Sequence, residues 1–387
     1  MDDFILKNCT FIPELTEGYD KTTGELRVNG GRIAEIAEHI DGSNAEGYDM
    51  QGRTVMPGLI DLHTHFVQWS SHSCYEAPVM DPCDVVMKYY KHGMTFMEQG
   101  YTTIRDCGSD YRGVNALARA LEEGILYGPR VIPCGLIVTP TEVGNDTFSG
   151  MYHEADGPEE FKKAAREEFK HGAKFLKIMS SGAFTNKGGI PKQSIIDRDE
   201  VQAAVHVAEM KGSYVASHCH SADAIVMAAE EGVRTIEHGS FLDDKGIELL
   251  KGNTASYVIP TLSTYAYYET TGGFKAKLKE ESFRCLARGC SAGLKYGWGT
   301  DIPLDMWLAH PGYEFKMRKQ FFGCSNVELL KQATIYSAVA SGLDEEIGTL
   351  AVGKCADMIA VNGDPSQDLA VMYEKPAHVW RGGKELN

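Results

Sequence analysis

Eight short runs of β-type residues, separated by longer amphipathic stretches, are the feature of this sequence that most limits its fold. This alternation predicts a parallel sheet whose strands are joined by crossover helices. Eight such units predict an α/β fold of the (β/α)8 TIM-barrel type over residues 55–344, with the working groups at the carboxyl ends of the strands. The predicted strands are 55–63, 101–106, 130–138, 173–179, 213–219, 234–238, 255–262 and 294–301.

The two flanks of the chain have a different pattern. Residues 1–54 and 345–387 contain short alternating runs and turn pairs such as Asn29-Gly30 and Asn362-Gly363. We expect both flanks to pair into one small β layer, a β-sandwich domain beside the barrel. Within residues 55–344, helix starts are predicted at Asp81-Pro82 and at the capping box from Ser325 to Glu328.

The overall charge limits the partners of the protein. The 387 residues carry 54 acidic and 38 basic side chains, a formal charge of -16 that repels nucleic acid and anionic lipid. The ten cysteines show no Cys-x-x-Cys spacing, which favours reduced thiols in a cytoplasmic protein. There is no signal peptide pattern and no apolar run long enough for a membrane span. We expect a small-molecule substrate and a homo-oligomer.

Histidines at strand ends point to a metal site. His63 and His65 lie two residues apart on the first predicted strand, so both imidazoles face the same side and can bind one cation. The pair alone also fits two half-exposed loop histidines. However, His218, His238 and Asp301 end the fifth, sixth and eighth predicted strands, and their combined placement favours a metal site at the barrel mouth.

A lysine at a fourth strand end does not fit this pattern directly. Lys177 ends the strand in GAKFLKIMSSG, but an ammonium group has no lone pair for a metal and is repelled by one. From residue type alone, a solvated or ion-paired lysine is the simpler interpretation.

Several motifs together resemble the amidohydrolase superfamily over nearly the whole chain. They are PGLIDLHTH, LKIMSSG, SHCH, IEHGSFLDD, GTD and the tail IGTLAVGKCADMIAVNGDP. Within that superfamily the chain looks most like the Xaa-Pro dipeptidase and zinc carboxypeptidase group, which includes ochratoxin-hydrolysing amidases.

The resemblance implies two divalent ions, with zinc as the default. His63, His65 and Asp301 would bind the more buried ion, and His218 and His238 the more exposed one. A carboxylated Lys177 would bridge both ions, because a carbamate is an anion with two ligand oxygens that nearby dications favour. Lys174 would point to the opposite side of the strand and is not preferred.

The resemblance also suggests residues on the substrate side. His220 is either a substrate-contacting group or a hydrogen-bonded histidine behind the ligands. Tyr265 resembles a tyrosine that polarises the substrate carbonyl, although packing explains it equally well. His310 resembles a histidine of the loop after the eighth strand, and loop solvation is its alternative. Arg105 and Asp106 are expected to form a structural ion pair.

Two departures from the family pattern concern the pocket and leave the predicted ligands intact. Ser221 stands where the family usually has glycine, and Ser181-Gly182-Ala183 replaces SGG. Substrate preference therefore transfers less safely than mechanism.

We predict hydrolysis of an amide or peptide bond beside a free carboxylate, in a dipeptide or N-acyl amino acid. A metal-bridging hydroxide would attack the carbonyl, and Asp301 would carry the proton to the leaving nitrogen. The enzymatic alternative is a cyclic amide hydrolase or deaminase of the same superfamily, such as an imidazolonepropionase-like enzyme, and Lys177 argues against its mononuclear members, which do without a bridging lysine. A non-catalytic scaffold is the alternative from another class, and such relatives typically lose ligands.

Overall fold

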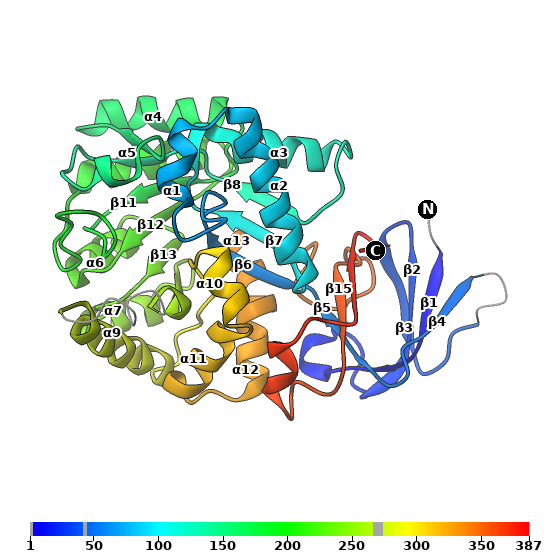
Figure 1. Cartoon of the computed structure of the whole chain (residues 1–387). Helices are drawn as coiled ribbons and strands as arrows, with labels where there is room; N and C mark the ends of the chain where they lie inside the picture. Colours follow the sequence, from blue (N-terminus) through cyan, green and yellow to red (C-terminus); the bar gives the residue numbers. More distant parts are fainter. Residues whose placement is uncertain (1–2, 42–44, 266–273, 387) are drawn as a thin grey trace.

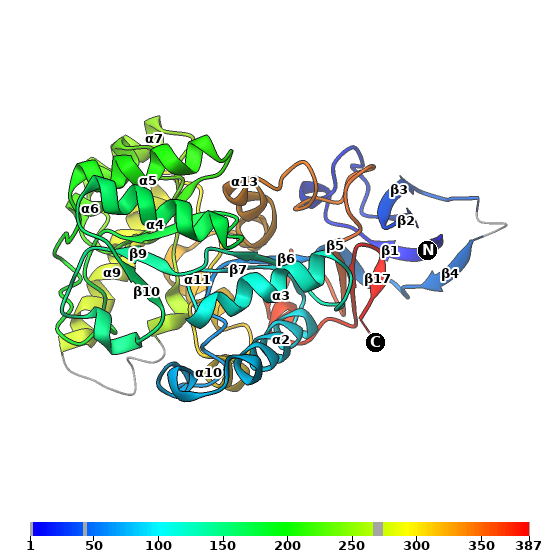
Figure 2. The ribbon, with the colours of Figure 1, turned by 90° about the horizontal axis from the view of Figure 1, so that it is seen from above.

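The computed structural model describes residues 3–41, 45–265 and 274–386 of the chain, with side chains from 277 onward in the last range. A small sheet lies beside a larger body in which helices surround parallel strands (Figure 1). The view from above, in Figure 2, shows the same two parts, with both ends of the chain at the small sheet.

The small sheet is built from both flanks of the sequence. Strand β5 pairs antiparallel with β15 and parallel with β1, so the N-terminal and C-terminal segments share one sheet. Leu6, Leu26, Met358 and Trp380 form part of its buried core. The strands are β1 (Phe4–Thr10), β2 (Thr23–Asn29), β3 (Arg32–Ala37), β4 (Glu46–Asp49), β5 (Thr54–Pro57), β15 (Met358–Val361), β16 (His378–Arg381) and β17 (Lys384–Glu385).

The larger body contains two sheets of parallel strands. Their orders are β6-β7-β8 and β10-β9-β11-β12-β13-β14. Lys174 N donates to Pro133 O at 2.8 Å beyond β8, and Gly297 N donates to Val258 O at 3.0 Å beyond β14, so bonds link the sheets on both sides. The strands are β6 (Leu59–Thr64), β7 (Tyr101–Asp106), β8 (Arg130–Pro133), β9 (Ile137–Thr139), β10 (Tyr152–Glu154), β11 (Leu176–Met179), β12 (Val215–Cys219), β13 (Thr235–His238) and β14 (Tyr257–Ile259).

The first predicted strand, 55–63, is wrong as a single element. It consists of β5 in the small sheet and β6 in the larger body, separated by Gly58. A Cβ atom at Gly58 would lie 2.2 Å from Thr102 Oγ1, so only glycine fits where the chain crosses between sheets. The continuous apolar run hides this crossing because both strands are buried.

Two other predicted strands also differ from the structure. The run 130–138 is divided into β8 and β9. The run 294–301 forms no strand. Its backbone makes an isolated bridge from Tyr296 to Val258, and Trp298 O accepts a hydrogen bond from Leu62 N over 2.8 Å. This segment still lies between β14 and β6, the position predicted for an eighth strand.

Helices cover the outside of the parallel strands (Figure 1). Asp81 and Ser325 cap two of them as the sequence predicts, and Asp197 caps a third. In the described residues, no helix combines the length and apolar character needed to cross a bilayer. The helices are α1 (Ser73–Glu76), α2 (Pro82–Glu98), α3 (Gly113–Glu122), α4 (Pro158–Lys170), α5 (Arg198–Met210), α6 (Ala222–Glu230), α7 (Asp244–Gly252), α9 (Phe274–Ser291), α10 (Leu304–Ala309), α11 (Tyr313–Phe322), α12 (Asn326–Lys331) and α13 (Ser337–Ser341).

Candidate metal centre

All the predicted metal ligands line one cavity at the carboxyl ends of the parallel strands. Its empty space is about 660 Å³ and is open to solvent. The side chains come from β6, β11, β12, β13 and the segment after Trp298. They are His63, His65, Lys177, His218, His238 and Asp301, and His220 lines the same cavity.

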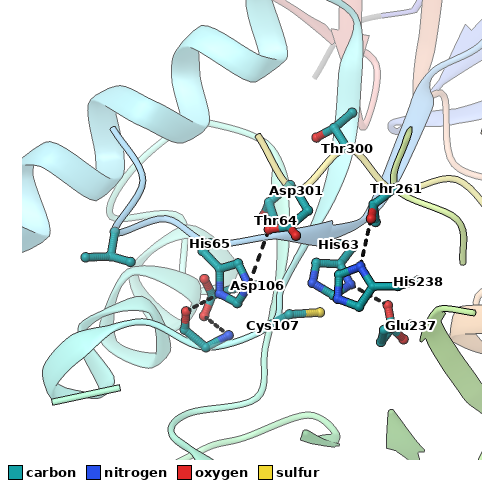
Figure 3. A network of polar contacts seen from close by, with 12 residues as sticks. His63, Thr64, His65, Asp106, Cys107, Glu237, His238, Thr261, Thr300 and Asp301 are labelled. Atoms are coloured by element: carbon teal, nitrogen blue, oxygen red, sulfur yellow. Dashed lines mark hydrogen bonds and ion pairs between the residues drawn. The ribbon is translucent and has the colours of Figure 1, made fainter. Parts of the chain in front are cut away.

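His63 is held by a buried carboxylate that the sequence analysis missed. The Nδ1–H group of His63 donates to Glu237 Oε2 over 2.7 Å, as Figure 3 shows, which leaves Nε2 free to bind a cation. The second oxygen of Glu237 accepts from Arg105 over 2.6 Å. Although burial alone would raise the pKa of Glu237, the Arg105 charge and the His63 hydrogen bond outweigh burial and lower the pKa to about 2. Glu237 is therefore ionised and fixes the orientation of His63.

The predicted ion pair between Arg105 and Asp106 is wrong. Arg105 pairs with Glu237, whereas Asp106 accepts from Phe66 N at 2.9 Å and from Ser109 Oγ at 2.7 Å. The physical reason is strand alternation, since adjacent residues on β7 point to opposite sides of the sheet.

His65 lies against Asp301. Its Nδ1–H donates to Gly108 O over 2.6 Å, and its Nε2 lies 3.6 Å from Asp301 Oδ1 (Figure 3). Ligand atoms of His63, His238 and Asp301 also lie within 4.8 Å of one another. The side chains assigned to the more buried ion therefore converge on one place.

His238 and His220 are oriented in the same way. Nδ1 of His238 is bonded to Thr261 Oγ1 at 2.7 Å, and Nδ1 of His220 to Ser240 Oγ at 2.7 Å. Ligand atoms of these two histidines and His218 lie within 4.8 Å of one another. In His238 and His220, Nδ1 is thus held by a hydroxyl and Nε2 is left for a cation, an arrangement typical of metal-binding histidines.

The histidines of the cavity are neutral. Burial lowers the pKa of His63 to about 4, with the Lys177 charge acting in the same direction, and burial lowers the pKa of His220 to about 3. Burial likewise lowers the pKa values of His65, His218 and His238. Neutral imidazoles present the lone pairs that a cation needs.

Lys177 and Lys174 have contrasting surroundings. Lys177 is 1% exposed and lines the cavity, and no carboxylate of the described residues lies within ion-pair distance of its amine. Lys174 is half-exposed and pairs with Glu122 at 3.0 Å on the outer surface. Of the two lysines, only Lys177 can reach the candidate ligands.

The backbone is strained at two of the candidate ligands. His238 has a φ of 68° and Asp301 a φ of 47°, in the left-handed region that costs a non-glycine residue about 1–2 kcal/mol. The turn at His238 ends strand alternation, so Glu237 and His238 both reach the same group of side chains.

Burial raises the pKa of Asp301 to about 7, against the lowering effect of Lys177.

Asp61 connects the first strand to the segment that carries Asp301. It accepts from Thr300 Oγ1 at 2.7 Å and from His63 N at 3.0 Å. The sequence contained a signal for this residue, because Asp61 precedes His63 by two positions on the same strand.

Tyr265 lies behind His220, outside the cavity lining. Its hydroxyl bonds to Ser240 Oγ at 2.8 Å and to Ser282 Oγ at 2.9 Å, and the side chain is 2% exposed. A hydrogen-bonded chain therefore runs from His220 through Ser240 to Tyr265. His310 is exposed and does not line the cavity.

Comparison with known proteins identifies the family. Residues 54–386 match the amidohydrolase family. The chain is 26% identical to ochratoxinase of Aspergillus niger in an alignment 369 residues long, which covers 85% of this chain and 75% of that protein once gaps are left out. A crystal structure of a prolidase complexed with N-methylphosphonate-L-proline is 27% identical, with a TM-score of 0.89 and 100% and 99% of the two chains covered.

A crystal structure of a Xaa-Pro dipeptidase with bound methionine has the same fold, with 24% identity, a TM-score of 0.86 and 100% of each chain covered. The chain therefore belongs to the amidohydrolase family, in the group that contains ochratoxinase and prolidase, and is an enzyme that hydrolyses C–N bonds.

Proposed function

We propose that this protein is a binuclear metal-dependent amidohydrolase that cleaves an amide or peptide bond in a small carboxylate-bearing substrate, such as a dipeptide or an N-acyl amino acid. The observation that carries the proposal is the convergence of five neutral histidines, four of them proposed ligands, with Asp301 and Lys177 on one cavity. Nitrogen and oxygen donors in this number suit zinc, although manganese and cobalt also bind them.

His63, His65 and Asp301 are the proposed ligands of the more buried ion, and His218 and His238 those of the more exposed ion. Nδ1 of His63 and Nδ1 of His238 are each held by a hydrogen bond. These bonds support the assignment, because they leave the other ring nitrogen of each histidine facing the cavity. Glu237 and Thr261 are the proposed supporting residues.

Carboxylated Lys177 is the proposed bridge. Lys177 is 1% exposed and lines the cavity together with the candidate histidine ligands, so a carbamate on its side chain would lie among them. Carbamate formation would replace its ammonium group with an anion that two dications stabilise.

Two divalent ions in this site would lower the pKa of water and polarise the scissile carbonyl. Asp301 accepts the proton of the attacking water and donates it to the leaving nitrogen. Asp301 Oδ1 lies 3.6 Å from Nε2 of His65 at the place where the proposed ligands converge, so its carboxylate is within reach of a water held there.

His220 is the proposed substrate-side residue. It lines the cavity through the ring edge opposite Ser240, and Tyr265 holds Ser240. We propose that Tyr265 helps to polarise the substrate carbonyl indirectly. Its hydroxyl holds Ser240, and Ser240 in turn orients His220.

Several apolar side chains line the cavity beside the candidate ligands and suit an apolar substrate part. Besides Lys177, the described lining offers no amine or guanidinium, so neutral donors such as Asn186 would bind the substrate carboxylate. The departure in Ser181-Gly182-Ala183 is at Ala183, which lines the cavity, whereas Ser181 positions His220 by accepting from His220 N over 2.8 Å. The apolar lining residues are Ile137, Phe148, Met151, Met179, Ala183 and Phe184.

The proposal includes the domain division. We assign residues 58–344 to the (β/α)8 barrel that carries the metals and residues 1–57 and 345–387 to a small β-sandwich domain. The predicted start of the barrel at residue 55 moves to Gly58 because strand β5 pairs in the small sheet. The homo-oligomeric state stays a prediction.

The test is an assay of the metal-loaded protein against dipeptides, N-acyl amino acids and cyclic amides. Release of a free amino acid from the first two classes, abolished by a chelator, supports the proposal. Turnover of cyclic amides alone would favour the imidazolonepropionase-like alternative and contradict the proposed substrate class.

A further inference from the structure

Two cysteines far from the candidate metal centre lie in unusually close contact. Sγ of Cys290, near the end of α9, is 2.8 Å from Sγ of Cys324, in the turn between α11 and α12. A disulfide bond requires about 2.05 Å between the sulfurs, so less than 1 Å of movement separates the thiols from bonding distance. Both residues are half-buried, so small oxidants can reach them.

The surroundings of the pair favour Cys324 as the nucleophile. Either thiol can donate the hydrogen bond between the two sulfurs; when Cys290 donates, the bond lowers the pKa of Cys324, and the charges of Arg318 and Lys319 act in the same direction against burial and Glu328. The same hydrogen bond, together with burial, raises the pKa of Cys290. One sulfur is thus prepared to attack and the other to resolve the product.

The other thiols of the chain lack this combination. Burial raises the pKa values of several cysteines, which keeps them protonated and poorly nucleophilic. Cys83 is exposed on α2, but among the described residues no second sulfur lies in contact with it. The buried cysteines are Cys9, Cys107, Cys134 and Cys219.

We propose that Cys290 and Cys324 are a redox modification site, which a peroxide converts into a disulfide bond. The Cys324 thiolate attacks the peroxide oxygen, forming a sulfenic acid and releasing hydroxide. The Cys290 thiol then attacks the sulfenic sulfur and releases water. Overall, two thiols lose two electrons and two protons, and hydrogen peroxide becomes two water molecules.

The bond would brace the segment that carries Asp301. It closes a covalent ring over residues 290–324, which contains the 294–301 segment, α10 and α11. Within that ring, Arg318 of α11 donates to Pro260 O at 2.6 Å and to Gly297 O at 2.9 Å, and α11 packs against α9 (Figure 1). Joining α9 to the end of α11 restricts the unfolded chain and stabilises this packing.

The test uses the reduced full-length protein treated with hydrogen peroxide, alkylated and digested with trypsin without reduction. Cleavage after Arg288 and Lys295 isolates Cys290 from Cys285, and cleavage after Lys319 and Lys331 isolates Cys324. We expect a cross-linked product of these two peptides and a higher urea midpoint, both reversed by dithiothreitol. A Cys83→Ser control should behave like the wild type.

Matched variants separate the site from general oxidation. Cys290→Ser should give no cross-link, should accumulate oxidised Cys324 and should show no rise in the urea midpoint. Wild-type protein in which Cys324 becomes sulfinic acid without cross-linking would overturn the proposal. So would a cross-link between two chains, and an unchanged midpoint of the cross-linked protein would overturn the bracing role.

Discussion

Nδ1 of His63 and Oε2 of Glu237 lie 2.7 Å apart in a fully buried contact, and Arg105 holds the second oxygen of the same carboxylate. The orientation of a candidate metal ligand therefore depends on an ion pair below the cavity. Two separable consequences follow, one for stability and one for metal affinity.

Replacing Glu237 with Gln should lower both the stability of the protein and its affinity for metal. The amide oxygen can accept from His63 or from Arg105 but not satisfy both, and the Arg105 charge loses its partner. We expect a loss of about 3–5 kcal/mol in the free energy of unfolding and about 10- to 100-fold weaker metal binding. Urea unfolding and metal competition titrations measure these effects.

Adding Arg105→Met to Glu237→Gln separates the two consequences. The double variant has no unpaired buried cation and should recover part of the lost stability, while its metal affinity stays low. Full recovery of metal affinity in the double variant would contradict the positioning role of Glu237.

Lys177→Ala should strip metal from the protein, because the proposed bridging anion is lost. Metal content measured after dialysis should fall below that of the wild type, and turnover should fall with it. Lys174→Ala is the matched control, since that amine pairs with Glu122 on the surface. Equal metal content in the two variants would rule out the carbamate bridge.

Asp301→Asn should lower kcat by about 10²- to 10⁴-fold through loss of proton transfer, while the fold is kept. The exposed Asp305 of α10 provides a control carboxylate, and Asp305→Asn should retain turnover. Wild-type kcat in Asp301→Asn would remove the proton-transfer role.

A buried carboxyl outside the ligand set should make stability depend on pH. Both side-chain oxygens of Asp110 are buried without a hydrogen-bond partner in the described structure, and burial raises the pKa of Asp110 to about 7. The unfolded chain releases this proton at lower pH than the folded protein, so Asp110 progressively destabilises the fold as pH rises from about 4 to 7.

Asp110→Asn should therefore raise the free energy of unfolding by about 1–3 kcal/mol at pH 8 and by much less at pH 5. Urea titrations of both proteins at the two pH values test this difference. The same gain at both pH values would show that ionisation of Asp110 is not its cause.

The sequence alone was enough to predict which residues line the cavity as candidate ligands and where most of the parallel strands lie, because both predictions rest on short-range periodicity. His63 and His65 share one side of β6 through their two-residue spacing. Gly58 marks a crossing between sheets that periodicity does not show, since the residues on either side are buried alike.

The residues that support the ligands were harder to predict because they come from distant strands. Glu237 on β13 contacts His63 on β6 and Arg105 on β7, so the three residues come from three different strands. In a regular strand the adjacent side chains of Glu237 and His238 would point to opposite faces of the sheet. Here the left-handed backbone of His238 brings both to the same side. Neighbouring charges in the sequence, Arg105 and Asp106, suggested a pair that alternation forbids.

The central claim is a binuclear centre that cleaves an amide bond, and a metal titration of the apoprotein tests it most directly. Zinc is added stepwise while release of the amino acid from a dipeptide or N-acyl amino acid is followed. The account predicts that turnover rises to a plateau at two equivalents of zinc per chain. A plateau at one equivalent, or full turnover of the metal-free protein, would contradict it.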